Sequence, residues 1–519
     1  MADFVSFVII LIALSILFTR KSLFKNPQWP SVPRVPFLGS IPWINGRKFP
    51  MQCIEWHKKY GPIFSYKPGL APEIIVVSGA RLTKELFVKN SPSFEFRYCP
   101  FFYADELKLE DHFTPLLNTS AAILHQRRVI AQAIKAGIGS GNDVGVQCAA
   151  VELINYIRST ISPKEGIDVG LNGLIEEAAG LSALSIGFGL QWTIKKLREC
   201  HEAQSLFSAV HKYFAYFNWV DDPSVAFPCL SWILFRRSRR IKNSAKLAAD
   251  ELLGSYQALF NITCKKVKVT GLDSLNPSVA QIVLSKDDET TQYRKTILCG
   301  STTTAAFSTT ADVLKVLIGT LAAFPEWQSS IRRELDELAD YQLRDSMFSD
   351  APPVFRMDKG KQNFPVTRAF LDETMRAFPI FPINTRVASK DFTLCDGRKI
   401  KSGQCLFTLP MCINHDPEMF EDPHEFNPRR FLKAKESIPS WYNFRHASFG
   451  SGRRSCPGAA LAEYSLFNFL CQLVYSFQFR YENGKTGVAG INSTLVGLEC
   501  HYTFPKVFVT PRARTPMST

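Results

Sequence analysis

The sequence has no C-x-x-C pair, although it contains 13 cysteines, and these cysteines are scattered singly along the chain. This pattern indicates neither a zinc site nor a disulfide framework, so we expect the protein to face a reducing compartment. The sequence also lacks any nucleic-acid-binding motif, although its net charge is +14, from 61 basic and 47 acidic residues. We therefore expect no nucleic acid partner. The positive charge is typical of a protein that meets an anionic membrane or an acidic protein surface.

No internal repeat and no long low-complexity tract divides the chain. Its 519 residues exceed the ~250–300 at which a single core usually stops growing, and 46% of them are hydrophobic. Most of the chain shows helical periodicity, whereas alternating and β-branched residues are concentrated in a predicted hairpin over 63–78. We predict a mainly α fold with small β-sheets, in one large domain with enough core to enclose a cofactor.

An uncharged hydrophobic run, FVSFVIILIALSILF, occupies residues 4–18, and three basic residues follow it within 20–25. A transmembrane helix needs ~17–25 residues, so a span would extend into the flanking residues. A cleaved signal peptide is the alternative, but the positive charges follow the run and no A-x-A-like cleavage site is present. We expect a single-pass anchor over 1–25 that leaves the rest of the chain cytosolic. A proline-rich hinge over 26–46 and one large domain over 47–519 are expected to follow it.

The segment FGSGRRSCPG, residues 449–458, places one cysteine in a glycine-rich, arginine-bearing loop. Cys456 follows Arg453 and Arg454 and precedes a helix that is predicted to begin near Pro457. Nearby cations and a helix N-terminus both lower the pKa of a cysteine thiol, which keeps the sulfur anionic, as a metal ligand must be. The alternative is a structural cysteine buried beside a turn. Three glycines permit the turns that would curl the loop around the sulfur: Gly450, Gly452 and Gly458.

Two charged residues three apart, Glu373 and Arg376, lie on one face of a predicted helix in the segment LDETMRAFP. Such a pair is most often an exposed ion pair of little energetic weight. A third charged residue, Arg430, follows in the segment PRRF, shortly before the cysteine loop.

In this order along the chain, the segments resemble those of the cytochrome P-450 family. The cysteine loop matches the family's haem-ligand pattern F-x-x-G-x-R-x-C-x-G without a gap, and the resemblance covers nearly the whole chain. It implies the cytochrome P-450 fold and haem b, with Cys456 as the axial iron ligand and 47–519 as the haem-thiolate catalytic domain. The other loop residues that it assigns to cofactor binding are Phe449, Gly450, Gly452, Arg454 and Gly458.

The resemblance also assigns a structural role to Glu373, Arg376 and Arg430. In the family these residues form a buried network that locks the chain before the ligand loop, and every charge in such a network must be satisfied.

The haem propionates need cationic partners, since buried carboxylates are costly without them. The resemblance assigns this role to Arg454, to Arg386, and to Arg128, which matches the arginine of the family's W-x-x-x-R. Leu124 replaces the tryptophan of that pattern, and His125 is expected to substitute for the lost contact. A solvated basic helix face that includes Arg128 and its neighbour Arg127 is the alternative.

The segment CGSTTT, residues 299–304, resembles the family's distal helix, whose signature is A/G-G-x-D/E-T-T. The resemblance places Gly300 beside the cofactor and Thr303 at the oxygen-activating position, where a threonine hydroxyl relays protons from water. A hydroxyl bonded back to its own helix is the alternative. Thr302 stands where most members carry an acid, so the residue that usually governs proton delivery is replaced.

The function implied by the resemblance is a haem-dependent monooxygenase that inserts one oxygen atom of O2 into a lipophilic small molecule, with a fungal-type role in secondary metabolite biosynthesis. The chain has no flavin or nicotinamide motif. Electrons are therefore expected from a separate NADPH-cytochrome P-450 reductase, with cytochrome b5 as a further donor, at the endoplasmic reticulum membrane. Two alternatives stay open. One is a haem-thiolate isomerase or dehydratase that needs neither O2 nor a reductase, and the other is a non-catalytic haem-binding protein.

Two further segments have a functional and a structural interpretation each. Aromatic residues gather where the family places a substrate-facing loop, although core packing explains them equally well: Phe94, Phe96, Tyr98, Phe101, Phe102 and Tyr103. An apolar segment over 232–235 precedes four arginines over 236–240. This pattern is typical of a surface that dips into anionic lipid, or of an ordinary helix with solvated arginines.

Overall fold

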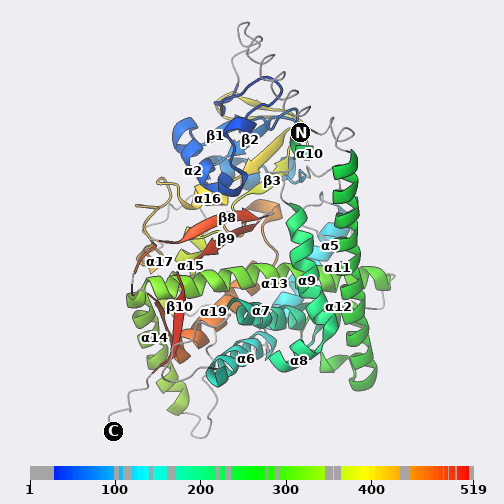
Figure 1. The fold of residues 1–519 in the computed structure, drawn as a ribbon, viewed down its shortest axis with the longest axis vertical. Coiled ribbons are helices and arrows are strands. Elements are labelled where there is room, and N and C mark those ends of the chain that lie inside the picture. Colours follow the sequence, from blue (N-terminus) through cyan, green and yellow to red (C-terminus); the bar gives the residue numbers. More distant parts are fainter. Residues whose placement is uncertain are drawn as a thin grey trace.

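Helices form most of the protein in the computed structural model, which describes residues 28–98, 105–108, 118, 120–139, 144–160, 171–217, 223–227, 235–275, 277–286, 291–344, 355, 364–432, 445–482, 484, 486–488, 490–496 and 499–512. The predicted mainly α fold with small β-sheets is confirmed (Figure 1). The predicted anchor over 1–25 lies outside the described residues.

The α-helices are α2 (Phe49–Tyr60), α3 (Ala80–Thr83), α5 (Ala121–Gly139), α6 (Val144–Thr160), α7 (Leu171–Phe188), α8 (Ile194–Glu199), α9 (His201–Phe214), α10 (Pro223–Ala226), α11 (Phe235–Thr270), α12 (Val279–Ser285), α13 (Gln292–Ala323), α14 (Pro325–Arg344), α15 (Pro365–Ala377), α16 (Pro410–Asn414), α17 (Arg429–Leu432) and α19 (Ala459–Ser476). The strands are β1 (Ile63–Tyr66), β2 (Ile74–Val77), β3 (Asn384–Val387), β4 (Phe392–Thr393), β5 (Lys399–Ile400), β6 (Cys405–Thr408), β7 (Phe477–Tyr481), β8 (Asn492–Val496), β9 (Glu499–Thr503) and β10 (Val507–Pro511).

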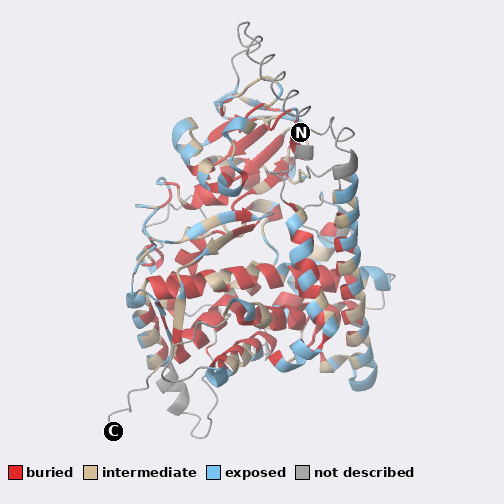
Figure 2. Ribbon diagram, viewed as in Figure 1, coloured by how far each residue is buried: buried red, intermediate tan, exposed pale blue. Residues whose placement is uncertain are grey.

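The long helix α13 crosses the middle of the molecule and packs most extensively against α7, with α11 and α19 also in contact (Figure 1). Thr291 caps it, because its side chain accepts a hydrogen bond from the Arg294 N–H at 3.3 Å. The helix ends before Pro325, which cannot donate a helical hydrogen bond and instead begins α14. By length and composition, α13 is the one helix among the described residues that could cross a membrane, but most of it is buried in the protein core (Figure 2).

The largest sheet joins segments that are far apart in the sequence. The predicted hairpin over 63–78 is present as β1 and β2, which pair antiparallel with Ile63 opposite Val77. Strand β6 then pairs parallel to β2, and β3 pairs antiparallel to β6, which gives the order β1-β2-β6-β3. Every residue of β1, β2 and β6 is buried, so both faces of these strands are covered, as their continuous apolar sequence requires.

The described part of the predicted hinge packs against this sheet. The Val32 N–H donates to the Ser65 carbonyl at 2.9 Å, and the Ser65 N–H donates to the Pro30 carbonyl at 2.8 Å. Trp29 and Val32 are both buried. The described part of the proline-rich segment, 28–46, is therefore held against β1.

A second hairpin, made of β8 and β9, lies between the β1-β2-β6-β3 sheet and α13 (Figure 1). Its strands pair antiparallel with Val496 opposite Glu499, so Glu499 is at the tip. This placement brings residues from the C-terminal part of the chain against the central helix.

Candidate functional site

The cysteine loop is closed by backbone hydrogen bonds and leads directly into α19. The Cys456 N–H donates to the Phe449 carbonyl at 2.8 Å, and the Arg453 N–H donates to Ser91 Oγ at 2.9 Å. Gly458 leaves room beside the sulfur, since a Cβ at this position would lie 3.7 Å from Cys456 Sγ. The Cys456 side chain is exposed. The loop therefore presents an accessible thiol from a fixed backbone.

Gly452 lets the loop pack directly on the chain at Phe87. Its φ is +68°, and a Cβ here would lie 1.7 Å from the Phe87 carbonyl oxygen. We expect Gly452→Ala to destabilise the protein by more than the ~1–2 kcal/mol of a left-handed residue, because a rigid backbone atom occupies the space. Denaturant unfolding measures this loss. Gly450→Ala is the matched control, because its φ is +70° but the nearest atom, Ser455 Cα, is 4.0 Å away. Equal losses for the two variants would contradict the prediction.

The pKa of the Cys456 thiol differs from the sequence-based expectation. Burial by the surrounding protein raises this pKa, while the Gly458 amide and the Arg127 guanidinium lower it, and the net shift is upward. The expected lowering by Arg453 and Arg454 is thus corrected: the cation that acts on the thiol is Arg127, in α5. A metal ion that binds the sulfur favours the ionised form of the thiol and so opposes this upward shift of the pKa.

Buried arginines gather near the loop. Burial and the nearby Arg454 lower the pKa of Arg386 to about 9. Burial and Arg127 lower the pKa of Arg454 to about 10, and Glu95 offsets part of this shift. Arg127 thus destabilises the charge of Arg454, and Arg454 destabilises the charge of Arg386. Such a group of cations favours the binding of anions, and carboxylates match the guanidinium geometry best.

Arg127, and not Arg128, reaches the cysteine loop. Arg127 Nη2 donates to the Ser455 carbonyl at 2.7 Å. Arg128 is exposed and its Nε donates to Leu124 of its own helix at 3.3 Å. His125 and Leu124 are exposed as well. Successive helix residues point about 100° apart, so only one of two adjacent arginines can face the loop. The solvated-face interpretation therefore holds for Arg128 but not for Arg127.

Arg97 joins this group of arginines, and sequence reasoning missed it. Arg97 Nη1 and Arg386 Nη1 both donate to the Thr385 carbonyl oxygen, at 2.7 and 2.8 Å. A β-bridge between Phe96 and Val387 holds the two segments together. Arg97 lies in no motif, and its place becomes visible only when this segment pairs with β3.

Glu373, Arg376 and Arg430 form a buried network. Glu373 accepts hydrogen bonds from Nε and Nη2 of Arg376 at 2.7 and 2.9 Å. Arg430 Nε lies 3.2 Å from Glu373 Oε2. Arg376 also donates to the carbonyls of Asn414 and Pro423, at 2.7 and 2.8 Å. One carboxylate thus holds two arginines, and these in turn hold the backbone that precedes the cysteine loop.

The structure places Thr303 and Gly300 against neighbouring helices. Thr303 is fully buried, its hydroxyl donates to the Cys299 carbonyl at 3.0 Å, and a Cβ on Gly187 of α7 would lie 1.9 Å from its Oγ1. Gly300 lies against the Tyr256 ring of α11. The hydroxyl of Thr302 donates to its own helix at 2.7 Å. The structure therefore shows the Thr303 hydroxyl bonded back to its own helix and fully buried.

After this buried stretch, α13 becomes accessible again two residues beyond Thr303. Ala305 is exposed, and Ala306 and Thr309 are half-buried, within a stretch that is otherwise buried. Residues four apart lie on the same helix face, so Ala305 and Thr309 share one side. The stretch AAFSTT, 305–310, fits the signature A/G-G-x-D/E-T-T at its first residue and at both threonines. Ser308 stands at its acid position, and sequence reasoning missed this register because both stretches are rich in threonine.

The aromatic cluster divides between core and surface. Phe94 is buried, with edge-on contacts to the rings of Phe87 and Phe392. Phe96 is exposed and Tyr98 is half-buried. Core packing therefore explains Phe94. The remaining aromatic residues of the cluster, over 101–103, lie outside the described residues.

The basic segment at the start of α11 is described only in part. Arg239 and Arg240 are exposed, as both interpretations of this segment require. The apolar residues over 232–234 lie outside the described residues.

The chain is similar to known proteins. The family model described as Cytochrome P450 matches residues 30–495. Among similar proteins, cytochrome P450 2M1 of Oncorhynchus mykiss is 24% identical and covers 92% of this chain and 91% of its own length. Cytochrome P450 monooxygenase COX1 of Coprinopsis cinerea is 25% identical and covers 92% of both chains. Cytochrome P450 monooxygenase macC of Penicillium terrestre is 23% identical and covers 92% of this chain and 88% of its own length.

A solved structure shares the fold. A zebra fish cytochrome P450, in a structure with progesterone, superposes with a TM-score of 0.67 at 21% sequence identity, over 89% of this chain and 99% of that chain.

Proposed function

The chain belongs to the cytochrome P450 family and is a P450 oxidoreductase, and from this premise we propose that it is a haem-thiolate monooxygenase acting on a lipophilic small molecule in secondary metabolism. The observation that carries the proposal is the accessible thiol of Cys456 in a closed loop beside a group of buried arginines. Relatives named as fungal monooxygenases, such as verH of Penicillium polonicum, support the secondary-metabolic role.

The residues of this site fit haem b, which is the cofactor we propose. A thiol that is accessible yet desolvated suits an iron ligand, because the metal supplies the charge that keeps the sulfur ionised. The Arg454 charge lowers the pKa of Arg386, and the Arg127 charge lowers the pKa of Arg454, so two propionate groups would relieve this repulsion. Arg97 is positioned to add a fourth cation. When bound, haem supplies the chemistry of oxygen activation, for which a thiolate ligand favours O–O cleavage.

Each part of the chain has a defined task in this proposal. Cys456 binds the iron, and the Gly458 amide donates to the sulfur and so tunes its basicity. The arginines orient the cofactor through its carboxylates. Thr309, on the accessible face of α13, holds and passes a proton through its Oγ1, which now donates to the Ala305 carbonyl at 2.8 Å.

Electrons are proposed to come from a separate NADPH-dependent reductase, with cytochrome b5 as a further donor. Arg453 supports this docking site, because it lies in the cysteine loop with a largely exposed side chain. An acidic partner surface would meet this basic residue close to the ligand. We further propose that the N-terminal anchor places the protein in the endoplasmic reticulum membrane with the catalytic domain in the cytosol.

The proposal is tested by the carbon monoxide difference spectrum of the reduced full-length protein, followed by turnover with a reductase. A long-wavelength Soret band and a substrate-dependent, O2-dependent consumption of NADPH are expected. A folded protein without the band would overturn the proposal. Turnover without reductase and O2 would instead assign the protein to the isomerase or dehydratase class.

Adjacent arginines of α5 provide a second prediction. We expect Arg127→Gln to weaken haem retention by about 10-fold to 100-fold, because a charge-assisted hydrogen bond contributes about 1.5–3 kcal/mol. Arg128→Gln is the matched control and should leave retention unchanged, since Arg128 bonds only within its own helix in the described structure. Haem loss to an acceptor protein measures both. A larger effect in Arg128→Gln would contradict the placement of Arg127.

A third prediction distinguishes Thr309 from Thr303 as the threonine of α13 that relays protons. We expect Thr309→Ala to divert electrons from product to peroxide and water by about 10-fold or more, because a positioned proton relay is lost. Thr303→Ala should leave this ratio unchanged and cost about 1 kcal/mol of stability, because a buried hydroxyl and methyl group are removed. Product formed per NADPH consumed is the measurement. If Thr303→Ala lowered product formed per NADPH and Thr309→Ala did not, Thr303 would be the relay residue, as the sequence alone predicts.

A further inference from the structure

A buried carboxyl group on the β8–β9 hairpin contacts the central helix. Glu499 is the first residue of β9 and is almost fully buried. Its Oε1 accepts a hydrogen bond from Ser308 Oγ of α13 at 3.1 Å. Ser308 is the residue that stands at the acid position of the helix signature, directly before the accessible Thr309. The β8–β9 hairpin therefore places the Glu499 carboxyl group beside Ser308, the helix residue that stands where the family signature has an acid.

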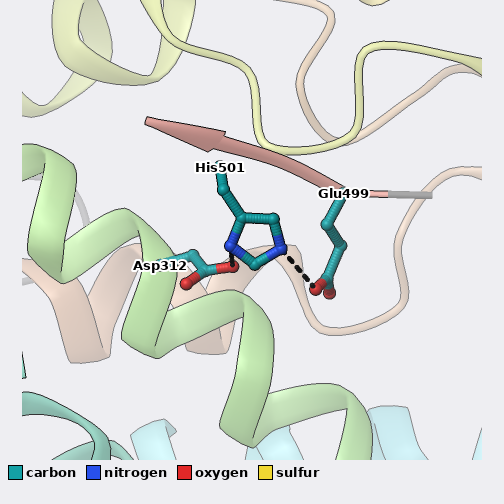
Figure 3. A group of neighbouring side chains, drawn as sticks. All are labelled: Asp312, Glu499 and His501. Carbon is teal, nitrogen blue, oxygen red and sulfur yellow. Dashed lines mark ion pairs between the residues drawn. The ribbon is translucent and has the colours of Figure 1, made fainter. Parts of the chain in front are cut away.

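A histidine connects this acid to the surface. Figure 3 shows the His501 ring lying between Glu499 and Asp312, with one ring nitrogen directed at each carboxyl group. His501 Nε2 is 3.9 Å from Glu499 Oε2, and Nδ1 is 3.6 Å from Asp312 Oδ2. The His501 side chain is 39% exposed, whereas that of Glu499 is 6% exposed. The three groups thus lead from an accessible ring to a buried acid and then to α13.

Burial, together with the neighbouring Asp312 charge, favours the protonated form of Glu499. Two carboxyl groups share Lys315: its Nζ lies 3.1 Å from Asp312 Oδ1 and 2.8 Å from Glu176 Oε1. Glu176 also pairs with His211 of α9 at 3.7 Å. Burial and the Asp312 charge raise the pKa of Glu499 to about 8, although Ser308, His211 and Lys315 act in the opposite direction. Glu499 therefore holds a proton at neutral pH.

We propose that Glu499 replaces the missing helix acid and delivers protons to the active site through Ser308, with His501 resupplying them from solvent. This inference rests on the proposed monooxygenase function. The Ser308 hydroxyl gives its proton to a water molecule at the accessible face of α13 and takes the Glu499 proton on its Oγ in exchange. The protonated His501 ring, 3.9 Å from the Glu499 carboxylate, then returns a proton to it through one water molecule and takes a new proton from solvent. One proton enters at His501 and one leaves at Ser308, and no electron moves.

The first test detects the proton without turnover. Infrared difference spectra of the full-length protein at neutral pH, wild type against Glu499→Gln, should show the carbonyl stretch of a protonated carboxyl group that the variant lacks. Glu176→Gln is the matched control, because Glu176 shares the charge network but does not contact Ser308, and it should keep the band. Absence of a Glu499-dependent band would overturn the proposal.

The pH dependence of stability gives an independent readout. An unfolded glutamate has a pKa near ~4.3, so between this value and about 8 only the folded form of Glu499 keeps its proton. In this window the glutamate ionises only in the unfolded chain, and this ionisation increasingly favours the unfolded state as pH rises. The wild type should therefore lose stability relative to Glu499→Gln as pH rises from about 4.3 to 8, and a constant difference would contradict a raised pKa.

The relay itself is tested by coupling. We expect both Glu499→Gln and Ser308→Ala to lower product formed per NADPH by about 10-fold or more, within the range for a lost general acid. Ser308→Ala should keep the infrared band, whereas Glu499→Asp should keep the band and recover part of the coupling. Unchanged coupling in Ser308→Ala would overturn the relay even if Glu499 is protonated.

Failure of this inference can be distinguished from failure of the proposed function. Glu499→Gln should keep the full carbon monoxide difference spectrum, because Glu499 does not contact the cysteine loop in the described structure. A wild type without that spectrum would reject the monooxygenase function, and the relay with it. A wild type with the spectrum but without the infrared band would reject only the relay.

Discussion

Replacing Cys456 with alanine is expected to abolish the long-wavelength Soret band of the reduced carbon monoxide complex and all substrate oxidation. Alanine removes the sulfur but keeps the Cβ, and the hydrogen bond from the residue 456 N–H to the Phe449 carbonyl does not depend on the side chain. The loop backbone should therefore persist. The variant loses the thiolate, which is the anionic iron ligand that we propose at this position. Water or another uncharged ligand does not donate electron density to the iron as a thiolate does.

The control for this prediction is another accessible cysteine. Cys395 is exposed and lies in the turn between β4 and β5, away from the loop. Cys395→Ala should keep the band at full intensity. Cys456→Ser should behave like Cys456→Ala, since a hydroxyl of similar size is not a thiolate. A band that survives in Cys456→Ala but disappears in Cys395→Ala would remove the assignment of the iron ligand.

The cysteine loop could be predicted from the sequence because its motif lies in one contiguous segment, although Gly452 and Arg453 contact Phe87 and Ser91, which are remote in sequence. The bond between Cys456 and Phe449 and the space beside Gly458 involve residues within one ten-residue segment. The direction of the thiol pKa could not be predicted in the same way. Burial, which dominates it, and Arg127, which opposes it, both come from elements remote in sequence.

The register of α13 shows where sequence reasoning fails. The segments 299–304 and 305–310 both lie in one long helix and both contain adjacent threonines. Helical periodicity indicates that a buried face exists but not which neighbour covers it. Gly187 of α7 and the Tyr256 ring of α11 cover the first segment, and these contacts depend on tertiary packing. The sequence therefore predicts a threonine of this helix, Thr303, that is buried in the described structure, whereas Thr309 is half-buried and accessible.

Residues whose role depends on a distant partner were the hardest to predict. Arg97 and Glu499 lie in no recognisable motif. Arg97 has its proposed role because it contacts β3, and Glu499 because it contacts α13, and both contacts join segments remote in sequence. The pair Glu373 and Arg376 is different. Its spacing of three predicts contact on a helix, and Arg430 lies in a recognisable segment, so the resemblance was sufficient to bring the three together.

Removing the carboxylate of that network is expected to have the largest effect on stability. In Glu373→Ala, the buried side chains of Arg376 and Arg430 lose their shared counterion. Breaking a buried ion pair from one side costs about 3–5 kcal/mol, because the remaining charge stays desolvated. The Asn427 N–H also loses its acceptor, which lies at 2.6 Å. We expect a fall in the denaturant midpoint and little haem-loaded protein, since the network holds the backbone before the cysteine loop.

An exposed ion pair is the control, because its loss shows what the removal of an ordinary salt bridge costs in stability. Glu418 pairs with Arg81 at 3.0 Å, and both side chains are more than half exposed. Glu418→Ala should change stability by no more than about 0.5–1 kcal/mol, because water already screens the pair. Glu373→Gln should fall between the two, since an amide keeps part of the hydrogen bonding but not the charge. If Glu373→Ala unfolded at the same denaturant concentration as Glu418→Ala, the buried charges would not be holding this region together. The desolvation of the two arginines, and not the number of hydrogen bonds, makes the Glu373 carboxylate indispensable for the stability of this region.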